Sequence, residues 1–223
     1  LYSLGTIKGL MQKFTYLLEQ VVADPGQKIA ELKLEPKQVL ATEREQEKYA
    51  YGEFSARTIV DILTDRVRER PANIAVVSGN KTVTYQELDE RSNRLAHYLI
   101  SRGAKKEDLV GLCIERHIDM IVAIIGIIKC GAAYVPIAPD YPRDRIAYIL
   151  KDCGAKILVS TVNLQHLVEG FDSVQTIYAD EPTGILTGLP SVRPGVSIKP
   201  DNILYVIYTS GSRGNPKEVL IQD

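Results

Sequence analysis

The sequence has 223 residues, of which 45% are hydrophobic and 25% are charged, a composition typical of a folded globular protein and not of a disordered one. Its 27 Lys and Arg residues nearly balance its 28 Asp and Glu residues, and the formal net charge of -1 excludes the strongly basic footprint of a dedicated nucleic-acid-binding protein. The three cysteines are widely spaced and form no CxxC motif, and the three histidines add no ligand pattern. We therefore expect no structural zinc site and no disulfide framework, which favours a reduced, cytoplasmic compartment.

The longest apolar run, 120–128, is far shorter than the about 20 residues that a membrane-spanning helix needs. The first residues show no charged-then-apolar signal pattern. We therefore expect neither a membrane protein nor a secreted one. The chain begins with Leu1 instead of Met, and we expect it to be cut from something longer.

Apolar residues recur every three or four positions over 4–23, which predicts an amphipathic helix that stops at Asp24-Pro25-Gly26. Residues 33–55 are polar and charged without a sustained period, which indicates an interdomain linker. A new domain is expected to begin near Ala56.

From there helix and strand patterns alternate. Thr58 with Asp61, and Thr84 with Glu87, have the spacing of capping boxes and predict the starts of two helices. A hairpin is expected between these helices, at 74–77 and 82–85. Apolar strands are then predicted at 109–114, 133–137, 156–160, 174–178 and 203–208, with helices at 117–130, 142–154 and, shorter, 164–169. Strands that are apolar throughout and separated by helices indicate an α/β fold with a mostly parallel sheet, covered by helices on both faces.

The segment after the last predicted strand, 208–217 (YTSGSRGNPK), is rich in glycine and hydroxyl side chains. Ligands of open α/β sheets bind beyond the carboxyl ends of the strands, where this segment is expected. Its glycines let backbone N–H groups turn toward an anion, its hydroxyls can donate to phosphate oxygens, and Lys217 adds a positive charge. The segment matches neither GxxxxGK[ST] nor GxGxxG. On composition alone it is either a phosphate-binding loop or an ordinary Ser/Gly-rich surface loop.

The same segment resembles the glycine-rich core motif of the AMP-forming adenylating enzymes. Residues 128–142 (IKCGAAYVPIAPDYP) resemble a second core motif, that of the amino-acid adenylation domains of nonribosomal peptide synthetases, and 83–88 (VTYQEL) resembles a third. Residues 4–32 are similar to the last helix of a condensation domain. The resemblance implies a condensation-like end at 1–32, a linker at 33–55 and the N-terminal part of an adenylation domain, with its α/β N-terminal subdomain fold, at 56–223.

The resemblance also implies a reaction. An amino acid carboxylate attacks the α-phosphate of ATP, with Mg²⁺ as a partner, and the aminoacyl group then passes to phosphopantetheine on a peptidyl carrier domain. A condensation domain in the same chain is the other implied partner, and neither nucleic acid nor membrane is implied. The implied nucleotide-binding residues are Thr209, Ser210, Gly211, Ser212, Arg213 and Gly214, with Lys217 as the catalytic cation.

Two residues depart from the motif: Arg213 stands where the family usually has Thr, and Glu218 stands where it usually has Gly. The family's later motifs do not occur before Asp223, so we expect this chain not to complete adenylation by itself. Two alternatives stay open: a non-catalytic adenylation fragment that acts as an interdomain platform, and an acyl- or aryl-acid CoA ligase of the same superfamily. Glu115 and Arg116 follow a predicted strand, where they either face a ligand or form a surface ion pair.

Overall fold

The computed structural model describes residues 4–33, 57–171, 173–180, 183–209 and 217–222. The chain divides into two compact units, Leu1–Ala56 and Arg57–Asp223, which are considered separately. The capped helices, the hairpin and the alternating strands predicted from the sequence all lie in the second unit.

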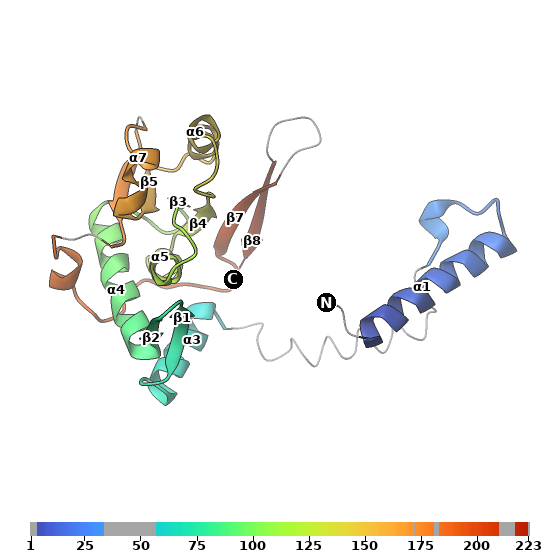
Figure 1. The fold of residues 1–223 in the computed structure, drawn as a ribbon, viewed down its shortest axis with the longest axis horizontal. Coiled ribbons are helices and arrows are strands. Elements are labelled where there is room, and N and C mark those ends of the chain that lie inside the picture. Colours follow the sequence, from blue (N-terminus) through green and yellow to red (C-terminus); the bar gives the residue numbers. More distant parts are fainter. Residues whose placement is uncertain (1–3, 34–56, 172, 181–182, 210–216, 223) are drawn as a thin grey trace. The chain divides into compact units, whose positions relative to one another are not determined.

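The first unit consists of helix α1 (Leu4–Ala23) and the short 3-10 helix η1 (Ile29–Glu31) (Figure 1). Gln20 on α1 fastens the returning chain, because its Nε2 donates to the carbonyl oxygen of Lys33 at 2.7 Å and its Oε1 accepts from the Lys33 N–H at 3.0 Å. The predicted apolar stripe of α1 is exposed, as at Leu10, Met11 and Phe14. None of the helices in the described ranges has the length and apolar character needed to span a membrane.

The second unit opens with helix α3 (Ile59–Glu69), the hairpin β1 (Ile74–Ser78) and β2 (Lys81–Thr84), and helix α4 (Tyr85–Ser101). Both predicted capping boxes are present. The Thr58 side chain accepts from the Asp61 backbone N–H, and the Thr84 side chain accepts from that of Glu87. Each box satisfies backbone N–H groups that a helix start leaves without an intrahelical partner, so these helices begin where the sequence predicts.

The main sheet has six strands in the order β6-β5-β3-β4-β7-β8. All neighbouring strands are parallel except β7 and β8, which are antiparallel and lie side by side at one edge (Figure 1). The strands are β3 (Leu109–Leu112), β4 (Ala133–Pro136), β5 (Ile157–Ser160), β6 (Gln175–Tyr178), β7 (Ile203–Thr209) and β8 (Lys217–Gln222). The mostly parallel sheet is confirmed, whereas β8 was not predicted.

Helices α5 (Ile118–Lys129), α6 (Arg143–Asp152) and α7 (Gln165–Val168) follow β3, β4 and β5, while the 3-10 helices η2 (Val162–Leu164) and η3 (Leu186–Gly188) lie in connections. The core has two layers, one on each face of the sheet. One layer joins α4 and α5 to strand residues such as Leu112 and Val159, and the other joins α6 to residues such as Val135 and Leu158. Helices therefore cover both faces, as predicted.

Gly111 in the middle of β3 permits close packing of α6. A Cβ at this position would come within 2.8 Å of the side chains of Leu150 on α6 and Leu158 on β5. The absence of a side chain thus lets α6, which connects β4 to β5, pack closely on the sheet.

Candidate active site

The topology of the sheet places a crevice between the carboxyl ends of β3 and β4. Helix α5, which follows β3, packs on one face, and helix α6, which follows β4, packs on the other. The two connections therefore leave the sheet in opposite directions, which opens a gap above the strand ends. Such a switch point is where open α/β sheets bind ligands.

A cavity of about 960 Å³ lies at this crevice. Its walls come from the segments that follow β3, β4 and β5 and from the second half of β7. They include Ile114, Glu115, Arg116, Ile137, Pro139, Asp140, Tyr141, Asn163, His166, Ile207 and Tyr208. The volume lies at the upper end of the range of about 300–1,000 Å³ that small-molecule sites occupy.

Polar groups gather on one side of this cavity. Glu115 and Arg116 both line it. Of the two alternatives for this pair, facing a ligand site or forming a surface ion pair, their position fits the first. The Glu115 carboxylate accepts a hydrogen bond from Asn163 Nδ2 at 3.3 Å, which joins the segment after β3 to the one after β5. Asn163 and His166 lie in the wall but were not predicted, because nothing in the local sequence connects Asn163 to Glu115, 48 residues earlier, or places His166 at the cavity.

Tyr134 connects the cavity to the edge of the sheet. Its ring stacks on that of Tyr205, with centroids 5.3 Å apart, across the β4–β7 pair. Burial raises the pKa of Tyr134, with a smaller contribution from Tyr205. The phenol therefore stays protonated at neutral pH and serves as a packing surface with a hydrogen-bond donor.

Strands β7 and β8 hold the two ends of the glycine-rich segment next to each other. Tyr208 is buried, and its hydroxyl donates to Asp152 Oδ2 at 2.8 Å, which ties the end of β7 to α6. Thr209 ends β7 and Lys217 begins β8, and these two residues are register partners. The other predicted site residues, Ser210, Gly211, Ser212, Arg213 and Gly214, lie outside the described residues.

Glu218 is placed by β8 opposite Tyr208. The motif that this segment resembles usually has Gly here, a residue that is needed where φ is positive. Because Glu218 lies in an antiparallel strand, its backbone has the extended conformation that any residue adopts. The backbone at this position therefore does not require Gly.

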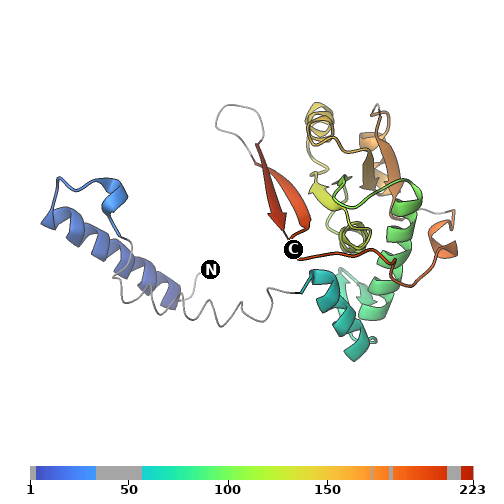
Figure 2. The same ribbon diagram turned by 180° about the vertical axis from the view of Figure 1, so that it is seen from behind.

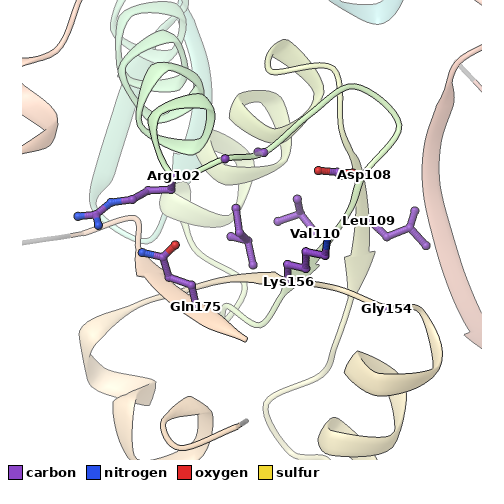
Figure 3. A pocket seen from close by; sticks show the side chains of 10 residues that line it. Arg102, Asp108, Leu109, Val110, Gly154, Lys156 and Gln175 are labelled. Atoms are coloured by element: carbon purple, nitrogen blue, oxygen red, sulfur yellow. The ribbon is translucent and has the colours of Figure 1, made fainter. Parts of the chain in front are cut away.

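A second, smaller hollow of about 210 Å³ lies at the opposite, amino edge of the sheet (Figure 3). Arg102 at the end of α4 lines it, together with Asp108, Lys156 and Gln175 at the starts of β3, β5 and β6. Open α/β sheets bind ligands at the carboxyl edge, which favours the larger cavity as the candidate active site.

The chain matches the family described as AMP-binding enzyme over residues 63–222. It is 34% identical over its full length to tyrocidine synthase 2 of Brevibacillus parabrevis, of which it spans 6%. It is also 36% identical, over 97% of its length, to the phosphinothricin tripeptide synthetase PhsC of Streptomyces viridochromogenes, of which it spans 20%. The chain therefore spans a small part of the curated relatives that it matches.

Among solved structures, the chain resembles a nonribosomal peptide synthetase, FmoA3, crystallised with α-methyl-L-serine-AMP, at a TM-score of 0.69 and 25% identity, covering 99% of this chain and 25% of that one. It also resembles the N-terminal subdomain of Klebsiella oxytoca NpsA, at a TM-score of 0.65 and 26% identity, covering 75% of this chain and 42% of that one. The α/β fold with its glycine-rich segment after β7 is thus that of a known family, and the chain belongs to the AMP-binding enzymes.

Proposed function

We propose that residues 56–223 are the N-terminal part of an adenylation domain in a nonribosomal peptide synthetase, and that the whole protein activates an amino acid with ATP. The observation that carries this proposal is that the cavity and the glycine-rich segment both adjoin β7. The cavity at the β3–β4 switch point has β7 as one wall, and β7 leads directly into the glycine-rich segment. The solved relative FmoA3 supports it, because that protein was crystallised with an aminoacyl-AMP and, separately, with AMPPNP.

In the proposed reaction an oxygen of the amino acid carboxylate forms a bond to the α-phosphorus of ATP, and the bond from that phosphorus to the bridging oxygen breaks. Pyrophosphate leaves with the electron pair, and the aminoacyl-adenylate remains. Residues 209–214 would hold the departing phosphates through hydroxyl groups and backbone N–H groups, and Lys217 would stabilise their negative charge. Both contributions grow as charge develops on the leaving group, which is how they accelerate the step.

Mg²⁺ fits this scheme as a partner of the phosphates. Within the described ranges, His, Cys, Asp and Glu side chains nowhere gather in a group of three that could hold a metal ion. Mg²⁺ commonly binds through one or two carboxylates together with substrate phosphates and water, so a dedicated protein cage is not needed. When bound with ATP, the ion would neutralise phosphate charge.

The partners follow from the same proposal. The aminoacyl group would pass to phosphopantetheine on a peptidyl carrier domain, and residues 1–32 would be the end of a condensation domain, joined by a linker at 33–55. The exposed stripe of α1 supports this assignment, because Leu10, Met11 and Phe14 form an apolar face that a neighbouring domain could bury. Replacing Phe14 with Ser in the full-length protein should weaken peptide-bond formation while leaving amino acid activation unchanged.

The test of activation is amino-acid-dependent ATP–pyrophosphate exchange by the full-length protein that contains this chain, with individual amino acids screened in turn. Replacing Lys217 with Met should lower the exchange rate by about a hundredfold or more, the usual loss when one transition-state charge contact is removed. Lys105→Met is the matched control, because Lys105 is exposed at the amino edge of the sheet, away from the candidate active site. Equal rates in the two variants would refute the role of Lys217.

Glu218 favours a second candidate, a non-catalytic platform, because its carboxylate follows Lys217 directly and would repel pyrophosphate. ATP binding without exchange for any amino acid, and without adenylation of aryl or acyl acids in the presence of coenzyme A, would support this candidate. Recovery of exchange in Glu218→Gly would then identify the carboxylate as the cause. Activity only with an aryl or acyl acid and coenzyme A would support a CoA ligase instead.

A further inference from the structure

Lys129, the last residue of α5, is completely buried. Its ammonium has three protons, and four acceptors on α4 surround it, of which the backbone carbonyl oxygen of Asp89, at 3.2 Å, is the most distant. Lys129 Nζ donates to Asp89 Oδ1 at 2.7 Å, to Ser92 Oγ at 2.8 Å and to Asn93 Oδ1 at 2.7 Å. Burial lowers the pKa of Lys129, while the hydrogen bond and charge of Asp89 oppose that shift. Each of the three ammonium protons therefore has an acceptor.

The ammonium determines which way the Asn93 amide faces. An ammonium only donates, so the amide oxygen of Asn93 turns toward it and the amide nitrogen turns away. That nitrogen then donates to Asp89 Oδ2 at 2.9 Å and to the carbonyl oxygen of Ser191 at 2.7 Å. Asn93 is itself completely buried, so both amide protons find partners without water.

Ser191 belongs to the segment 189–202, here called the strap, which has no helix or strand of its own and leads into β7. The strap passes along α4 before it reaches β7 (Figure 2). Besides the bond from Asn93, His97 Nε2 lies 2.9 Å from the Val192 carbonyl oxygen, and Lys106 Nζ donates to that of Ser197 at 3.0 Å. The strap is therefore held by side chains that contact its carbonyl oxygens, where a strand or helix would use backbone hydrogen bonds.

The strap leads into β7 and is therefore one support of that strand. Only one register pair, Tyr134 with Tyr205, joins β7 to β4 among the described residues, whereas β3 and β4 share four. The pairing of β7 with β8, the stack of Tyr205 on Tyr134 and the hydrogen bond from Tyr208 to Asp152 also hold β7, so the chain that enters the strand is one of several supports. The strap is that chain, and Thr209 at the far end of β7 begins the glycine-rich segment.

We propose that Lys129 is a positioning residue, whose ammonium orients Asn93 so that the strap, and with it β7, is held in place. The catalytic part of this proposal rests on the proposed function. The competing interpretation is that Lys129 merely joins α5 to α4. That interpretation predicts changes on those two helices, or throughout the unit, and not on a strap that the proposal connects to Lys129 through Asn93.

Two variants separate the interpretations. Lys129→Met removes the ammonium. Asn93→Asp keeps the shape and the acceptor that faces Lys129, but it replaces the donor that faces Ser191 with a second acceptor. Lys151→Met is the matched control, because Lys151 also lies in the last turn of its helix, α6, and is exposed. If Lys129→Met fails to fold, Asn93→Asp still tests whether the Asn93–Ser191 bond holds the strap, without which the proposal fails.

The first measurement is amide hydrogen exchange of the 223-residue chain. Both variants should speed exchange in the strap and the first half of β7 by about fivefold to tenfold, as expected for the loss of one buried hydrogen bond. The control should leave those amides unchanged. Strap exchange in Asn93→Asp equal to that in the control, or a uniform rise in exchange over the whole second unit in both variants, would overturn the proposal.

The second measurement is ATP–pyrophosphate exchange by the full-length protein. Asn93→Asp should raise the KM for ATP several-fold and leave the KM for the amino acid unchanged, because β7 leads into the segment proposed to bind phosphate. An equal rise in both KM values would overturn the catalytic part. Absence of exchange in the unaltered protein, together with locally faster amide exchange in the variants, would refute the proposed function and retain the structural role of Lys129.

Discussion

Replacing Gly131 with Ala tests how tightly the strap is packed against the end of α5. Gly131 has φ +86, in the left-handed region, and a Cβ there would lie 2.9 Å from Val196 Cγ1 on the strap. The backbone conformation costs an L-residue about 1–2 kcal/mol. Forcing a methyl group into a packed contact costs about 1–3 kcal/mol more, so the free energy of unfolding should fall by about 2–5 kcal/mol in total.

Gly154→Ala provides the matched control, because Gly154 has φ +65 and an added Cβ would meet nothing within 4 Å. Urea denaturation should show a loss of only about 1–2 kcal/mol for this variant, from the backbone alone. In the Gly131→Ala background, Val196→Ala should return about 1 kcal/mol, whereas by itself it should destabilise the protein. Equal losses of unfolding free energy for the two glycine variants, together with additive effects of the Gly131 and Val196 changes, would refute this reasoning. They would show that the strap moves away from the added methyl group at no measurable cost.

Three further predictions concern the second unit. Thr58→Ala should lower the free energy of unfolding by about 1 kcal/mol in urea denaturation, while Thr58→Ser, which keeps the hydroxyl that caps α3, should lower it much less. Hydrogen bonds from the backbone and side chain of Thr84 lower the pKa of Glu87 below its usual 4.5. The stability advantage of the unaltered protein over Glu87→Gln should therefore be fully present above pH 4.5 and disappear as the pH falls through the lowered value, as urea denaturation at pH 3 and pH 7 would measure. Burial raises the pKa of Cys113 and Cys130 to about 11, so a thiol reagent at about pH 8 should modify one cysteine quickly in the folded protein and all three in urea.

Local signals in the sequence predicted most of the second unit. The two capping boxes determined the starts of α3 and α4 because the partners lie three residues apart and need no tertiary context. The apolar runs predicted strands near their observed bounds, since strands buried on both faces carry almost no polar residues. Pro142, predicted as the first residue of its helix, instead caps α6, which begins at Arg143. Helix boundaries shift by a residue in this way because a proline fits both positions.

Features that depend on distant residues were missed. Strand β8 consists of only six residues, and it exists as a strand because β7 lies beside it. The Lys129 cluster joins residues 36 to 40 positions apart, and the bond from Asn93 to the strap spans 98 positions. A signal was nevertheless present: Lys129 is the only basic residue of a mostly apolar helix, where a buried ionisable side chain needs partners.

The same topological event accounts for both the cavity and the need for the strap. Because α5 and α6 leave the sheet on opposite faces, the crevice opens between β3 and β4, and the next wall of the cavity must come from a strand on the far side of β4. That strand is β7, which follows β5 and β6 in the sequence although those two strands lie on the other side of β3. The strap therefore connects one side of the sheet to the other. A buried donor at the end of α5 lies on this return path, next to the turn that begins β4. Lys129, which joins α5 to α4, is therefore well placed to influence the strand that leads to the glycine-rich segment.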